Sequence, residues 1–161
     1  MGTGTLPSVG HGLDGASVHP VSALRFVPLG ADYSELIEHW FEDDSTVRFV
    51  GGLDWLASTL RFERPDDTQP VDGRDPVAHH AWLALSREQP VALVDVLGYN
   101  DGSASMKMTV APARRKLGLG KAVLQAVWRL PEMADVTEVF GYVDPSHHAA
   151  VRLAEAAGFV A

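Results

Sequence analysis

The segment from Val110 to Lys121 carries residues suited to binding a phosphate group. A strand-like run ends at Pro112, and an apolar-periodic helix follows a stretch rich in cations and glycine: Arg114, Arg115, Lys116, Leu117, Gly118, Leu119, Gly120 and Lys121. The first turn of a helix has N–H groups without intrahelical partners and a partial positive charge. Glycines let backbone come close to an anion. We predict that residues 114–121 bind phosphate, and the alternative is a solvated basic turn.

Two familiar phosphate motifs do not fit this segment. The Walker pattern needs four residues between its glycines, whereas Leu119 alone separates Gly118 from Gly120, and Ala122 stands where Ser or Thr is required. The dinucleotide fingerprint needs a third glycine at the position of Val123. The segment therefore matches neither of these two motifs.

The segment resembles the acyl-CoA pyrophosphate loop of the GNAT acetyltransferases. The family pattern Q/R-x-x-G-x-G/A is met by Arg115, Gly118 and Gly120, after a strand that ends in Val-x-Pro. A second segment is similar to the last helix of the family, N-x-x-A-x-x-L-Y-x-x-x-G-F, and four of its positions match: Ala150, Leu153, Gly158 and Phe159. His147 replaces the usual Asn, and Ala154 replaces the Tyr that protonates the departing thiolate in many relatives.

The resemblance covers residues 21–159. Within the family, the local sequence is most similar to that of the aminoglycoside 6'-N-acetyltransferase and siderophore acetyltransferase branch. It implies an α+β protein with the GNAT fold, a mixed and mainly antiparallel sheet with flanking helices. The chain ends two residues after Phe159, where the family adds another strand. We therefore expect the last strand to be missing, and a homodimer to cover the open sheet edge.

The resemblance also implies how acetyl-CoA binds. The strand before the phosphate loop and the strand before the last helix splay apart and admit the pantetheine arm. Its amides pair with the backbone of Met108, Thr109 and Val110, as a ligand adding a strand. No metal is needed, because the thioester is already activated.

Direct attack by an amine on the acetyl carbonyl needs a neutral amine, and a carboxylate can bind the ammonium and take its proton. Asp95 is one candidate, because it stands alone in the apolar run Val91–Leu97. Its alternative is an edge or solvent-facing aspartate, or one that is paired with an arginine. Asp144 is the other candidate, and its alternative is a turn or helix cap before Pro145.

The departing thiolate needs an acid. His147, His148 and Tyr142 are candidates, against the alternatives of surface histidines and a core aromatic ring. His79 and His80 do not suggest a metal site, because neighbouring positions on a strand point to opposite faces.

Composition narrows the class of protein. A chain of 161 residues with 46% apolar residues suits one domain, and the absence of cysteine excludes disulfides and thiolate catalysis. A net charge of −8 disfavours nucleic acid and favours a small cationic acceptor. No run is long enough to span a membrane and no leader is visible, so we expect a cytoplasmic enzyme.

The pattern along the chain predicts the elements that must position these residues. We expect residues 1–20 to form a flexible arm and residues 21–161 to form one domain. The arm could still dock on the domain. Helices are expected at 32–41, at 53–62, after the phosphate loop up to Pro131, and from 147 to the end. Strands are expected at 23–27, 81–85, 91–97, 103–110 and 136–143, and an exposed loop at 63–76.

The sequence thus predicts an acetyl-CoA-dependent N-acetyltransferase that acts on a small cationic amine through direct transfer. The loss of the Tyr at Ala154 and the early end of the chain leave one alternative open. It is a degenerate module with the GNAT fold that binds CoA, or has a structural role, without catalysis.

Overall fold

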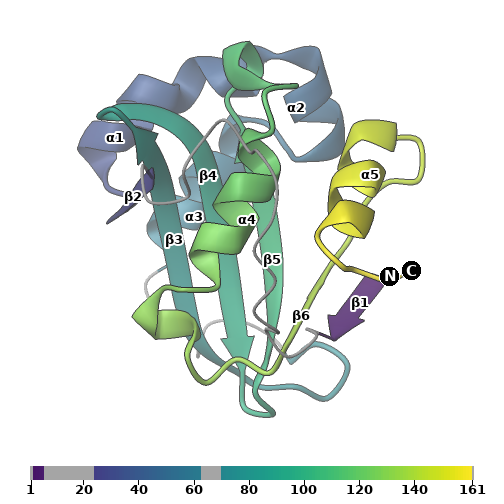
Figure 1. The fold of residues 1–161 in the computed structure, drawn as a ribbon. Helices are drawn as coiled ribbons and strands as arrows, with labels where there is room; N and C mark the ends of the chain where they lie inside the picture. The colour runs from purple at the N-terminus through teal and green to yellow at the C-terminus, as the bar shows by residue number, and fades with distance from the viewer. Residues whose placement is uncertain (1, 6–23, 63–69, 161) are drawn as a thin grey trace.

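The computed structural model describes residues 2–5, 24–62 and 70–160. Its centre is a six-stranded sheet in the order β1-β6-β5-β4-β3-β2 (Figure 1). All neighbouring strands are antiparallel except β5 and β6, which run parallel. The strands are β1 Gly2–Thr5, β2 Leu24–Pro28, β3 Pro76–Ser86, β4 Gln89–Tyr99, β5 Ser103–Val110 and β6 Glu138–Gly141.

Helices cover both faces of the sheet. The helices of the N-terminal half are α1 Ala31–Ile37, the 3-10 helix η2 Glu38–Glu42, α2 Asp44–Phe49 and α3 Leu53–Arg61. On the opposite face lies α4 Leu119–Val127, preceded by η4 Pro112–Arg114 and followed by η5 Pro131–Met133. The last helix, α5 His148–Ala156, follows β6 and lies beside α4 (Figure 1). None of the helices in the described residues is long and apolar enough to cross a membrane.

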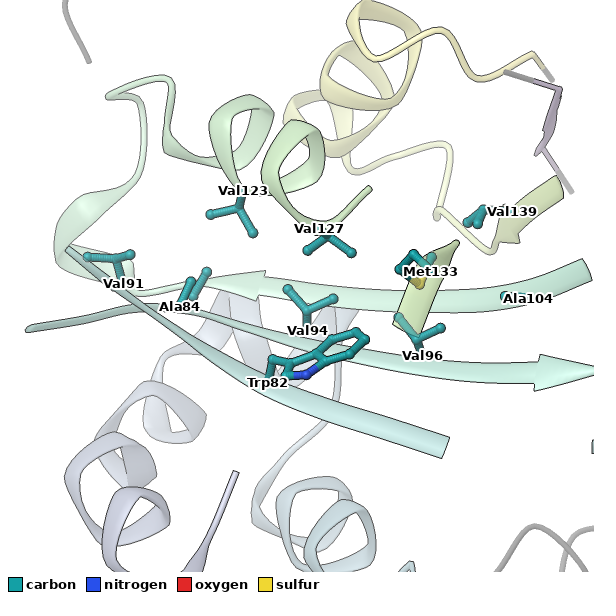
Figure 2. Packing of buried hydrophobic residues seen from close by; sticks show 11 residues of the cluster. Trp82, Ala84, Val91, Val94, Val96, Ala104, Val123, Val127, Met133 and Val139 are labelled. Carbon is teal, nitrogen blue, oxygen red and sulfur yellow. The ribbon is translucent and has the colours of Figure 1, made fainter. Parts of the chain in front are cut away.

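The alternation of side chains along β4 builds two cores. Val94 and Val96 point toward α4 and pack with its Val123 and Val127 (Figure 2). Leu93 points the other way, into a cluster formed with α1, η2 and α3 that includes Ile37, Trp40, Phe41 and Leu56. Both faces of β4 are covered, and this explains why its sequence is a nearly continuous apolar run.

The parallel pair β5–β6 is short, and the two strands diverge. Pairing joins Ser103–Ser105 to Glu138–Phe140 and extends no further in the described residues. At the next residue of β6, a Cβ on Gly141 would lie 2.9 Å from the carbonyl oxygen of Met106, so only glycine fits there. Beyond this contact β5 and the segment after β6 part (Figure 1), and we call this divergence the splay; it agrees with the feature expected from the family resemblance.

Most elements agree with the sequence prediction, and the differences have local causes. β5 and the start of α3 are as predicted. The helix predicted at 32–41 is α1 followed by the 3-10 helix η2, and α2 was not predicted. β3 begins at Pro76 rather than at residue 81, so His79 and His80 belong to the strand, because pairing with β4 extends it.

The N-terminus corrects two expectations. Gly2–Thr5 form β1, which pairs antiparallel with β6, so this part of the predicted flexible arm belongs to the sheet. Residues 6–20 of the arm and residues 63–69 of the predicted loop lie outside the described residues. No strand follows α5 in the described part of the chain, and β1 occupies the β6 edge that was expected to be open.

Candidate functional site

The loop between β5 and α4, residues 111–118, presents an open helix start. Gly118 is the N-cap of α4 and has a φ of +76°, in the left-handed region that favours glycine. A Cβ at Gly118 would meet no atom within 4 Å. Arg114, Lys116 and Leu117 are exposed, as is Lys121 in the first turn of α4. The space around Gly118 is open, and the first N–H groups of α4 have no intrahelical partner, as an anion site requires.

Gly120 has a different role from the one that the motif suggested. A Cβ at Gly120 would lie 2.8 Å from Cδ2 of Leu153, on α5. The glycine therefore lets α4 and α5 approach each other, and a substitution there would disturb packing as well as the loop.

Within the described part of the chain, Arg115 is the basic residue of the loop whose side chain is held by hydrogen bonds. Its Nη1 donates to Asp43 Oδ2 at 2.8 Å, and its Nη2 donates to Thr46 Oγ1 at 2.6 Å. Asp43 is the N-cap of α2, and its side chain also accepts from the Thr46 N–H. The hydrogen bonds from Thr46 and Arg115 lower the pKa of Asp43. Sequence analysis missed these partners, since they lie about 70 residues away along the chain.

The splay fits an extended ligand on β5. Beyond Ser105 the edge of β5 has no strand partner in the described residues, and this edge includes Met108, Thr109 and Val110. Three large apolar side chains in the segments that leave the two strands are exposed to solvent: Leu117 at 54%, Tyr142 at 67% and Val143 at 40%. Such exposure at a free strand edge is typical of a site that a ligand covers.

Asp95 faces the side of the sheet that carries α3, and it has two charged or polar neighbours. The register places Asp95 opposite Lys107 on β5 and opposite Ala81 on β3. His79, two residues from Ala81 and on the same face, lies with its Nε2 2.5 Å from Asp95 Oδ1. The His79 and Asp95 side chains are 11% and 21% exposed. The lone charge in the apolar strand is therefore paired with a histidine.

Aromatic rings from α3 and its end border this cluster. The Phe62 ring centroid lies 4.0 Å from that of His79, and the Lys107 ammonium lies 4.5 Å from the Trp55 ring centroid. Burial lowers the pKa of Lys107, while the charge of Asp95 acts in the opposite direction. Trp40 and Trp82 are instead buried, each in one of the two cores.

His79 is the partner of Asp95 that sequence reasoning missed. The prediction started β3 at residue 81 and so left His79 outside the strand. A strand extended to Pro76 would have placed His79 and Ala81 on one face, and the register then brings His79 to Asp95. The alternation of side chains with a period of two could have been extended back to Pro76, but His and Pro are weak indicators of a strand.

Asp144 has the structural role that was its alternative. Its Oδ1 accepts from the Ser146 N–H at 2.8 Å and from the Ser146 hydroxyl at 2.6 Å, and its carbonyl oxygen accepts from the His147 N–H. These bonds form the turn that leads into α5. They also lower the pKa of Asp144, which makes it a weaker base.

The residues proposed to protonate the thiolate lie in the segment after β6. Tyr142 is exposed and is not a core residue. The His147 ring stacks on Phe49 with centroids 4.2 Å apart and planes at 11°. Burial, followed by the charge of Arg115, lowers the pKa of His147, so the neutral imidazole is favoured. His148 is exposed. In the described residues, no three His, Asp or Glu side chains gather as they would around a metal ion.

A cavity of about 260 Å³ lies at the outer edge of β3, where β2 ends. Its lining includes Thr59, Phe62, His79, Trp82 and Glu132. The cavity therefore reaches the same His79 that pairs with Asp95. It offers aromatic surface and one carboxylate, which suits an apolar or cationic group.

Comparison with known proteins places these features in a family. The model of the acetyltransferase (GNAT) family matches residues 33–159. Among curated proteins, an uncharacterized N-acetyltransferase of Bacillus subtilis, YfmK, is 24% identical over 139 residues, which is 84% of each chain.

Two solved structures illustrate the similarity in fold. The aminoglycoside N(6')-acetyltransferase of Legionella pneumophila has a TM-score of 0.65 at 19% identity, over 84% of this chain and 79% of that one. The spermidine N-acetyltransferase of Vibrio cholerae, in complex with CoA and spermine, has a TM-score of 0.66 at 17% identity, over 86% and 82%. Because the family model matches residues 33–159, well over half of the chain, the chain belongs to the GNAT acetyltransferase family.

Proposed function

We propose that the protein transfers the acetyl group of acetyl-CoA to a small cationic amine by direct attack, with Asp95 as the base. The observation that carries this proposal is the Asp95 carboxylate, which is hydrogen-bonded to His79 and faces α3 one strand away from the splay. A carboxylate in this position can bind an ammonium group and remove its proton.

The splay and the β5–α4 loop hold the cofactor in this proposal. The N–H groups at the start of α4 and the cations of residues 114–121 bind the pyrophosphate, and the backbone of residues 108–110 binds the pantetheine arm. Acetyl-CoA supplies an activated acyl group. The amine nitrogen forms the new bond to the acetyl carbon, the carbon–sulfur bond breaks, and CoA leaves as the thiol.

Asp95 and His79 have different roles in the reaction of the amine. His79 Nε2 donates to Oδ1 of Asp95 and fixes the carboxylate. The second oxygen, Oδ2, accepts no hydrogen bond within the described residues and is available to the acceptor. Asp95 is therefore the residue that takes the proton, and His79 is a positioning residue.

Lys107 adds a like charge beside the incoming ammonium. A second cation near the acceptor disfavours its protonated form, which lowers the pKa of the acceptor amine. Protonation of the thiolate by Tyr142 or His147 stays a prediction, and a neutral His147 is the less suited of the two to give up a proton.

The chemistry of the acceptor follows from charge and from the cavity beside His79. A net charge of −8 attracts cations, and Glu132 with the Phe62 and Trp82 rings suits a second cationic or apolar group of the same acceptor. Polyamines and aminoglycosides, which the solved neighbours bind or act on, are therefore the first acceptors to try. A cytoplasmic location and a homodimer belong to the same proposal, although β1 covers the edge from which the dimer was inferred.

Release of CoA thiol from acetyl-CoA in the presence of a panel of amines tests this function. We expect amine-dependent thiol release with at least one polyamine or aminoglycoside, and a mass increase of one acetyl group on that amine. Binding of acetyl-CoA without turnover of any amine would favour the noncatalytic module instead.

A further inference from the structure

Helix α2 contacts the segments that follow both strands of the splay. It lies at the end of the molecule where α4 and α5 begin (Figure 1). Its N-terminus is bonded to Arg115, in the loop after β5. Its last residue, Phe49, stacks on His147, which precedes α5. A helix from the acceptor side of the protein thus joins the two sides of the proposed cofactor site.

The contact with the β5–α4 loop is a closed set of hydrogen bonds. Asp43 Oδ2 accepts from the Thr46 N–H at 2.9 Å, from the Thr46 hydroxyl at 3.1 Å and from Arg115 Nη1 at 2.8 Å. Arg115 Nη2 donates to the Thr46 hydroxyl at 2.6 Å, and Thr46 is fully buried. The Arg115 and Asp43 side chains are 30% and 32% exposed, so the network is partly buried and is anchored on the buried Thr46 hydroxyl, which favours one geometry.

The next residue of the loop needs such support. Lys116 has a φ of +64°, in the left-handed region that is unfavourable for a residue with a side chain. Conformations of this kind persist where the surroundings fix them. Arg115 is the immediate neighbour of Lys116, and its guanidinium is held at two points by α2. The anchor therefore keeps the strained loop, and the amides after it, in place before a ligand arrives.

We propose that Asp43 and Thr46 are positioning residues that preorganise the β5–α4 loop for the pyrophosphate of acetyl-CoA. Neither residue belongs to the phosphate-loop motif, and α2 lies outside the loop itself. An ordered loop loses less conformational entropy on binding, so the anchor raises affinity for acetyl-CoA. This inference rests on the proposed cofactor site, and it adds that the acceptor-side helix α2 sets the affinity of that site.

Calorimetric titration of the full chain with acetyl-CoA tests the proposal. Asp43→Asn keeps an oxygen for capping α2 but loses the charge that holds Arg115. Thr46→Val keeps the shape and loses both hydroxyl bonds. We expect each variant to bind acetyl-CoA about tenfold more weakly, the equivalent of one hydrogen bond to a charged group. The kcat at saturating acetyl-CoA should stay within about twofold of the wild-type value.

Two further variants separate positioning from general stability. Thr46→Ser keeps the hydroxyl and should bind acetyl-CoA as the wild type does. Asp54→Asn, in the first turn of α3, removes an equal charge away from the loop and should also leave binding unchanged. Wild-type affinity in Asp43→Asn and Thr46→Val would overturn this inference alone. A wild-type chain that binds no acetyl-CoA would overturn the proposed function with it. If Thr46→Val fails to fold, the comparison of Asp43→Asn with Asp54→Asn decides.

Discussion

At the scale of single residues, His79 contributes to the proposed reaction by orienting the Asp95 carboxylate. Replacing His79 with Phe removes the hydrogen bond to Oδ1 and keeps an aromatic ring beside Phe62. We expect kcat to fall about tenfold, because the carboxylate loses its orientation. Replacing His79 with Gln restores a donor and should recover most of the activity. Steady-state kinetics with saturating acetyl-CoA measure both effects.

Asp144→Asn is the matched control for this prediction. An asparagine side-chain oxygen can accept the same hydrogen bonds from Ser146, so the turn before α5 is kept. We expect activity within about twofold of wild type. Loss of activity in Asp144→Asn together with full activity in His79→Phe would move the acceptor site to the turn after β6.

The residue scale also shows how far the sequence could lead. The unusual position of Asp95 in an apolar strand was visible, since an unpaired charge there is costly. Its partner was not, because the pairing depends on the register of β3 and β4 and on a strand that starts at Pro76. The contact between Arg115 and Asp43 is likewise set by tertiary packing and has no local signal.

At the scale of elements, the two glycines of the phosphate loop should respond differently to aspartate. Gly118→Asp meets no atom within 4 Å at its Cβ, and Asp tolerates a positive φ, so we expect a loss of only about 1 kcal/mol in stability. The new carboxylate would face the phosphates, and the affinity for acetyl-CoA should fall at least about tenfold. Titration and thermal unfolding measure the two quantities.

Gly120→Asp should instead affect both properties strongly. Its Cβ would overlap Leu153 of α5, and such overpacking costs about 1–3 kcal/mol. A Gly118→Asp variant that binds acetyl-CoA like the wild type would remove the start of α4 from the cofactor site, whatever Gly120→Asp does.

The prediction of elements succeeded where local signals are strong. Asn100-Asp101-Gly102 marks the hairpin between β4 and β5, and Gly102 has a φ of +82°. Pro112 and Pro131 bound the segment that contains α4, as proline does at helix ends. The 3-10 helix η2 was not separated from α1, because its apolar residues continue the pattern of the predicted helix 32–41. The short α2 was not predicted.

At the scale of the whole molecule, the family resemblance predicted the mixed sheet and the splay, both of which the structure contains. The pairing of β1 with β6 could not be predicted. Gly2–Thr5 hold no apolar periodicity, and the partner strand lies more than a hundred residues away along the chain. Pairing between strands that are far apart along the chain depends on the completed fold, so a local sequence pattern cannot predict it.

The same scale explains why the site lies where it does. The sheet brings the cofactor edge of β5 and the His79–Asp95 pair within three adjacent strands, β3, β4 and β5. The register sets Asp95 beside Lys107, and Lys107 is the second residue after β5 and β6 part. A donor bound in the splay and an acceptor on the α3 side of the sheet would therefore meet near Lys107.

The central claim is tested most directly by the kcat/KM for the amine in Asp95→Asn, with the affinity for acetyl-CoA measured on the same protein. Asparagine keeps the size of the side chain and cannot take a proton. We expect kcat/KM to fall about tenfold to a hundredfold or more, while the Kd for acetyl-CoA is unchanged. An Asp95→Asn variant that acetylates the amine at the wild-type rate would contradict the account.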